Sequence, residues 1–188
     1  MNQEPWLIFE NDEDDNEPMT RAYGPEDEVD LATLYVDRPD EVITARKALM
    51  PVEQSLRDAG LYAYGTFDDQ HRWIVASDDE AGRVDVRVGK DGFEVQLWVT
   101  SPGLYAEVEN EWRRRAMERL ARMTIPKIAQ GMLQSHQSAE WDEVEHGVGV
   151  RITFEVPFTR VNDIGALVRS HFPELEELLT FVESQVVD

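Results

Sequence analysis

The clearest structural signal lies in residues 83–100, which read RVDVRVGKDGFEVQLWVT. Apolar and polar residues alternate in two runs on either side of Gly89-Lys90-Asp91-Gly92. Alternation with a period of two predicts strands with one buried and one wet face, and the glycine-containing interval predicts a turn. The region therefore predicts an antiparallel hairpin whose buried positions are Val84, Val86, Val88, Phe93, Val95, Leu97 and Val99.

Further strand signals lie on both sides of this hairpin. Residues 61–67 and 72–77 are short apolar runs that end in turn-forming residues, so they extend the hairpin to an antiparallel meander of three to four strands. Residues 139–145 and 148–158 predict a second hairpin near the C-terminus, joined at His146-Gly147. In its second strand the residues expected to share one face are Val148, Val150, Ile152, Phe154 and Val156.

Helical periodicity marks three other segments. Residues 42–60 follow a capping Asp40, residues 104–125 form a long central helix, and residues 162–186 form the C-terminal helical region. Pro51 and Pro126 predict a kink or break, and Pro173 predicts the start of a separate final helix. For the central helix, the stripe expected to face the core is Leu104, Val108, Trp112, Ala116 and Leu120. The fold class predicted is α+β, with a long central helix and terminal helices packed on the strands.

The charge is distributed unevenly. The 188 residues carry a net charge of −21, and residues 1–41 alone carry 14 acidic and 2 basic groups. This region contains four prolines and no sustained periodicity, as is typical of an extended segment. We therefore predict an acidic, flexible N-terminal arm over residues 1–39 and a single α+β domain over residues 40–188.

Composition excludes several functional classes. A strongly acidic surface argues against direct binding to nucleic acid or to an anionic membrane, because both attract Lys- and Arg-rich surfaces. The absence of Cys excludes thiol nucleophiles, thiolate metal sites and disulfides. No apolar run approaches the roughly 20 residues of a membrane-spanning helix, and residues 1–4 lack the basic region of a signal peptide. We expect a cytoplasmic protein.

The motifs of catalysis are missing from the sequence. It contains no glycine-rich phosphate loop and no nucleophile elbow. The four histidines, His71, His136, His146 and His171, have none of the spacings of a metal site. The sequence therefore predicts no catalytic residue, no metal ligand and no cofactor.

Three groups of residues are candidates for partner binding. Trp6, Leu7, Ile8 and Phe9 interrupt the acidic arm, where they either add a strand to the domain or serve as a docking peptide. Trp98 lies on the polar side of its strand and, with Trp141, is a candidate exposed aromatic unless a helix covers that side. Arg115, Arg119 and Arg122 share one helix face, which is either neutralised by nearby Glu111 and Glu118 or docks an acidic partner or the acidic arm.

The order of the predicted elements resembles a known fold. The order resembles that of the type III secretion chaperone-like fold, which YbjN-like bacterial domains share. The elements that carry the resemblance are a first helix over residues 42–60, a meander over 61–100, a long helix over 104–133, a hairpin over 139–158 and a last helix over 162–186. Small size and acidity also suit such chaperones. The resemblance implies a non-enzymatic protein, commonly a homodimer, whose clients lie as extended segments over apolar patches and strand edges.

We therefore expect a non-enzymatic protein-binding module, chaperone-like or an adaptor, whose partner is another protein that is basic or partly unfolded. The main alternative is an acidic inhibitor, either a toxin immunity protein or a nucleic-acid mimic, which needs carboxylates on a rigid surface. An enzyme of unrecognised type would need a deep pocket with perturbed pKa values. Adaptation to high salt would explain the acidity without a function, and the 15 Arg and 3 Lys are compatible with it.

Overall fold

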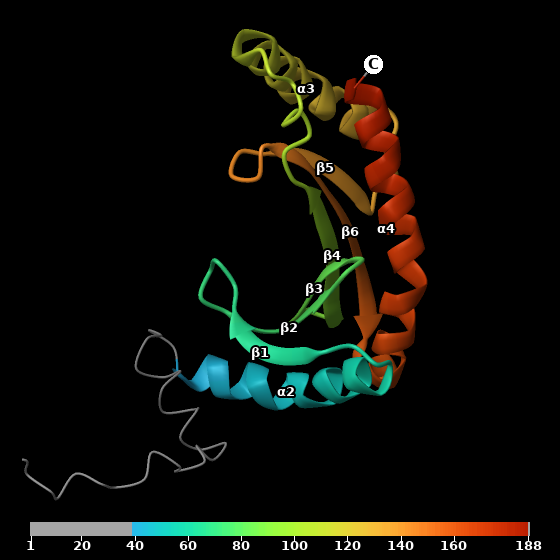
Figure 1. Cartoon of the computed structure of the whole chain (residues 1–188). Coiled ribbons are helices and arrows are strands. Elements are labelled where there is room, and N and C mark those ends of the chain that lie inside the picture. Colours follow the sequence, from blue (N-terminus) through green and yellow to red (C-terminus); the bar gives the residue numbers. More distant parts are fainter. Residues whose placement is uncertain (1–38, 188) are drawn as a thin grey trace, which may run out of the picture.

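The computed structural model describes residues 39–187. Within them the chain forms three α-helices, six strands and one short 3-10 helix (Figure 1). In order these are α2 (Pro39–Asp58), β1 (Ala63–Phe67), β2 (Trp73–Asp79), β3 (Gly82–Val88), β4 (Gly92–Ser101), α3 (Glu111–Gly131), β5 (Gln137–Asp142), β6 (Gly147–Pro157), η1 (Phe158–Asp163) and α4 (Ile164–Val187).

The strands form one antiparallel sheet in the order β1-β2-β3-β4-β6-β5. The first four strands are a meander, and α3 connects β4 to the C-terminal hairpin, whose second strand pairs with β4. In the β3–β4 hairpin Val86 pairs with Val95, so the alternation read from the sequence places the valines on one face. The predicted α+β class, with a meander of four strands and a C-terminal hairpin, is confirmed.

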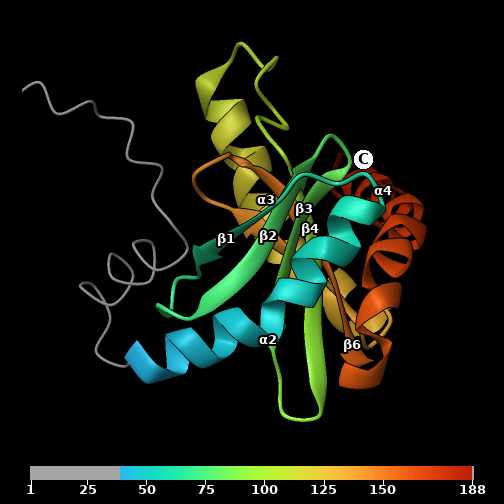
Figure 2. The ribbon, with the colours of Figure 1, turned by 90° about the horizontal axis from the view of Figure 1, so that it is seen from below.

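All three helices pack on one side of the curved sheet (Figures 1 and 2). Helix α2 contacts β1, β2 and β3, α4 contacts β4 and β6, and α3 contacts β5. The buried core between them includes Leu49, Leu56, Val84, Val95, Leu97, Ile125, Ile152 and Leu175. We call the opposite side the open face, and its side chains include Arg83, Asp85, Arg87, Glu94, Gln96, Trp98 and Arg151.

Helices α2 and α4 cross closely at Gly165. Its backbone N–H donates to Ser55 Oγ over 3.0 Å, and Ser55 Oγ donates to the carbonyl oxygen of Asn162 over 3.0 Å. A Cβ on Gly165 would lie 2.2 Å from the carbonyl oxygen of Ser55, which is far inside van der Waals contact. The crossing therefore requires glycine at this position.

Three prolines lie inside helices, and none of them ends its helix. Pro51 is in α2, Pro126 in α3 and Pro173 in α4. Each is exposed, so the backbone carbonyl that loses its donor at each proline can hydrogen-bond to water. The breaks considered at Pro51 and Pro126 do not occur, and α4 is one helix rather than two segments that meet at Pro173.

Helix α3 begins at Glu111 rather than at residue 104. The backbone N–H of Leu104 donates to the carbonyl oxygen of His146 over 3.2 Å, so this part of the chain is bonded to the β5–β6 turn. The helix begins after Asn110, whose side chain accepts the N–H of Arg113 over 3.0 Å as an N-cap. Within the described residues, no helix combines the length and the hydrophobicity that crossing a bilayer requires.

Candidate functional site

Helix α3 carries an apolar stripe on its exposed side. Trp112, Leu120 and Met123 are 84%, 60% and 59% exposed, and Ala116 lies exposed between them. Steps of four, four and three residues place these four side chains along one line of the helix. We call them the outer stripe. In Figure 1 the first turns of α3 project beyond the sheet, and the exposed fractions show that the other described elements leave this line uncovered.

The outer stripe lies opposite the buried side of α3. The buried residues of α3 are Ala121, Ile125 and Ile128, with Met117 half-buried against the core. The expectation that Trp112, Ala116 and Leu120 face the core is therefore wrong. Leu104 and Val108, which were expected to extend that line, lie in the segment before the helix.

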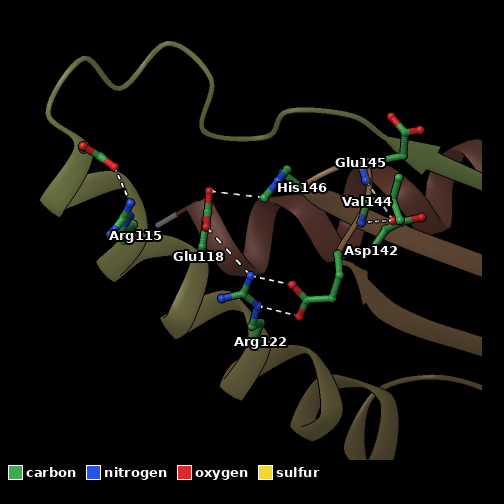
Figure 3. Close-up of polar contacts among 9 residues, drawn as sticks. Arg115, Glu118, Arg122, Asp142, Val144, Glu145 and His146 are labelled. Atoms are coloured by element: carbon green, nitrogen blue, oxygen red, sulfur yellow. Dashed lines mark hydrogen bonds and ion pairs between the residues drawn. The ribbon is translucent and has the colours of Figure 1, made fainter.

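The predicted arginines lie on α3 but differ in their partners (Figure 3). Arg115 forms an ion pair with Glu111 one turn earlier. Arg122 donates to both carboxylate oxygens of Glu143, from Nε over 2.8 Å and from the guanidinium NH2 over 2.6 Å. Arg119 is exposed and forms no ion pair with any residue between 39 and 187.

Arg122 also positions the turn between β5 and β6. Its guanidinium lies 5.5 Å from the ring centroid of Trp141, and Glu143 belongs to that turn. Asp142 Oδ1 accepts the backbone N–H groups of Val144 and Glu145, which fixes the shape of the turn (Figure 3). Arg122 is therefore a positioning residue between α3 and the turn, and its charge is already paired.

A groove of about 370 Å³ lies between α3 and the adjoining loops. His146 and Glu118 face each other in it, but Nδ1 and Oε1 are 3.8 Å apart, which is too far for a hydrogen bond. The Tyr105 hydroxyl donates to the carbonyl oxygen of Val186 over 2.8 Å, and burial together with the Glu118 carboxylate raises its pKa. The groove therefore holds no assembled acid–base pair.

Trp98 lies on the open face of the sheet, as the alternation of β4 predicts. Its indole Nε1–H donates to Asp85 Oδ2 over 3.1 Å, and the Arg83 guanidinium lies 5.8 Å from its ring centroid. No helix among the described residues covers this side. Trp141 differs from expectation, because it is half-buried, packs against the core and stacks on Tyr105.

A polar cluster that sequence reasoning missed joins the α3–β5 connection to α4. Glu174 accepts hydrogen bonds from His136 Nε2 over 2.8 Å, from Gln137 Nε2 over 2.7 Å and from His171 Nδ1 over 2.8 Å. Burial alone would raise the pKa of Glu174, but these hydrogen bonds outweigh it and lower the pKa from 4.5 to about 2. Only the three-residue spacing of His171 and Glu174 was visible in the sequence.

This cluster is a structural link rather than a metal centre. Across residues 39–187, no three His, Asp or Glu side chains are placed to hold a metal ion. Trp6, Leu7, Ile8 and Phe9 lie outside the described residues, as does most of the predicted arm over residues 1–39, so both stay predictions. Comparisons with family models, with curated proteins and with solved structures find no match to this chain.

Proposed function

We propose that the protein is a non-enzymatic binding module for another polypeptide and acts as a chaperone-like protein or an adaptor. The outer stripe of α3 carries this proposal. A surface helix normally has one apolar stripe, which faces the core, whereas α3 has a buried side and a second apolar line that is exposed. Trp and Met are enriched at protein interfaces, so Trp112 and Met123 support a protein partner.

The surroundings of the stripe favour binding over catalysis. Among the described residues that line the adjacent groove, Tyr105 is committed to a backbone carbonyl, and His146 is too far from Glu118 to exchange a proton with it directly. The nearby arginines Arg115 and Arg122 are held in ion pairs with carboxylates of the same domain. These contacts fix the shape of a surface, and none of them activates a described side chain of the groove as a nucleophile.

The order of the elements supports the chaperone-like form of the proposal. The order resembles that of type III secretion chaperone-like and YbjN-like domains: one helix, a meander, a long helix, a hairpin and a last helix. The edge strand β1 reads AYGTF, with neither a charge nor a proline in its own sequence, and Arg57 of α2 donates to the carbonyl oxygen of Ala63 at its start over 3.1 Å. Such an edge accepts an added strand, which suits a partner with an extended, partly unfolded segment.

The alternative of an acidic inhibitor finds less support. A mimic of nucleic acid needs rigid carboxylates that remain available to a basic partner. On the open face, several carboxylates are instead paired with arginines of the same sheet, as Asp85 is with Arg83, Glu94 with Arg87 and Glu140 with Arg151.

The proposal is tested by quantitative capture of partners from cells of the source. The tagged full chain is compared with the stripe variant Trp112→Ser/Leu120→Ser and with the control Met50→Ser/Phe181→Ser, which removes two exposed apolar side chains from α2 and α4. We expect one or a few proteins to be captured by the wild type and the control and about tenfold less by the stripe variant. Equal capture by all three chains, or no enriched protein, would refute the proposal.

A further inference from the structure

Three cations border the outer stripe. Arg119 precedes Met123 by four residues, Lys127 follows Met123 by four, and Arg113 precedes Ala116 by three, so each lies beside the stripe on the helix surface. All three are exposed, and none forms an ion pair within residues 39–187. The surface is therefore apolar in the centre and positive at its rim.

The carboxylates of α3 do not neutralise this rim. Glu111 pairs with Arg115, and Glu118 lies 3.9 Å from Arg122 and 3.8 Å from His146 on the side that faces the groove (Figure 3). A chain with a net charge of −21 thus presents a positive, apolar helix face.

The positive charge of the rim favours a negatively charged occupant over a second copy of the same surface. A second copy that docked stripe against stripe would bring Arg113, Arg119 and Lys127 of both copies together, and like charges facing each other across an interface are unfavourable. A complementary occupant must instead carry bulky apolar side chains directly beside negative charges.

Residues 4–17 of the same chain have this composition. They read EPWLIFENDEDDNE, with four consecutive apolar residues, seven carboxylates and no basic residue. We propose that this segment docks on the outer stripe of α3. Its apolar residues cover Trp112 and Leu120, and its carboxylates lie against Arg113 and Arg119.

The length of the intervening chain permits this contact. Residues 10–38 provide 29 residues between Phe9 and the start of α2. A flexible chain of that length has a root-mean-square span of about 30 Å and a fully extended reach of about 100 Å. A domain of this size has a radius of gyration of about 15 Å, so the segment can reach any part of its surface. Tethering makes the docking intramolecular and raises the effective concentration to about the millimolar range.

The docked segment regulates the binding surface. That a protein partner uses the same stripe rests on the proposed function above. Residues 4–17 then compete with this partner, and its apparent affinity is the intrinsic affinity multiplied by the fraction of chains that are undocked. The docking itself requires no partner, and it is measurable on the isolated full chain.

Paramagnetic relaxation tests the contact directly. Because the chain has no Cys, Gln3→Cys gives a single site for a nitroxide label next to the segment. In the isotope-labelled full chain we expect that, among the amide signals of residues 39–187, those of residues 112–127 broaden most. Reversing the rim in Arg113→Glu/Arg119→Glu should lower the ratio of docked to undocked chains about tenfold.

The matched control is Lys47→Glu/Lys90→Glu, which changes the net charge equally at exposed lysines on α2 and in the β3–β4 turn and should leave the broadening intact. Absence of broadening on α3, or equal loss in both double variants, would overturn the proposal. So would broadening that appears in full only when spin-labelled and isotope-labelled chains are mixed, because the occupant is then a second copy. The readout does not involve the captured partner, so this inference and the proposed function fail independently.

Discussion

The carboxylate of Glu174 provides a stability test that follows from its three hydrogen bonds. Its pKa is about 2 in the folded chain against 4.5 ordinarily. A lowered pKa stabilises the fold above pH 4.5, and this stabilisation is lost as the pH falls toward 2. The difference of about 2.5 pH units corresponds to at most about 3.4 kcal/mol at pH 7. Because the side chain is 30% exposed, solvent screening reduces the expected contribution to about 1–2 kcal/mol.

The variant Glu174→Gln removes this contribution. We expect urea unfolding at pH 7 to show a loss of about 1–2 kcal/mol. The difference in the free energy of unfolding between the variant and the wild type should shrink below pH 4.5. It should reach half its value at about pH 3.2, midway between the folded and the ordinary pKa of Glu174. Glu177→Gln is the control, because Glu177 is exposed on the same helix and pairs with no described residue. A constant difference between Glu174→Gln and the wild type from pH 7 to 3 would refute the reasoning.

Three further predictions concern packing, and each is measured by urea unfolding at pH 7. Gly165→Ala should lower the free energy of unfolding by about 2–3 kcal/mol, because the new methyl group overlaps the backbone of α2. The control Gly131→Ala should be neutral or stabilising, because its methyl group meets nothing within 4 Å. Equal effects of the two substitutions would contradict the close crossing of the helices. Ser55→Ala should cost about 1–3 kcal/mol, because it leaves the buried N–H of Gly165 without an acceptor; an unchanged midpoint would count against that bond. Leu120→Gln should change the free energy of unfolding by less than about 0.5 kcal/mol, while Ile125→Ala should lower it by about 2–4 kcal/mol. The reverse ranking would mean that α3 packs on the domain through the outer stripe.

The sheet was predictable because each of its strands carries local information. Residues 83–100 alternate strictly, and a strand with one buried and one wet face tolerates no slip of one residue. The pairing of Val86 with Val95 follows from that alternation and from the short turn between them. The same reasoning placed Trp98 on the polar side, where it is half-buried beside Asp85 and Arg83.

The helices were less predictable, because their ends and orientations depend on contacts between segments that are far apart in the sequence. A helix can accommodate a proline on its exposed side, where water replaces the lost hydrogen bond, and the exposure of Pro51, Pro126 and Pro173 could not be read from the sequence. The cluster around Glu174 has the same origin. His136 and Glu174 are 38 residues apart and meet only because the α3–β5 connection lies against α4.

Helix α3 shows why the error about its orientation is informative about function. Its sequence contains two apolar lines, one through Trp112, Ala116 and Leu120 and the other through Ala121, Ile125 and Ile128. Periodicity detects both lines but does not say which one faces the sheet. Charge separates them in retrospect, because Arg113 and Arg119 border the first line, and burying two unpaired guanidinium groups against a sheet would be costly. An apolar line whose bordering cations form no ion pair within residues 39–187 therefore suits an anionic partner rather than the core. Residues 4–17 of the same chain have that character.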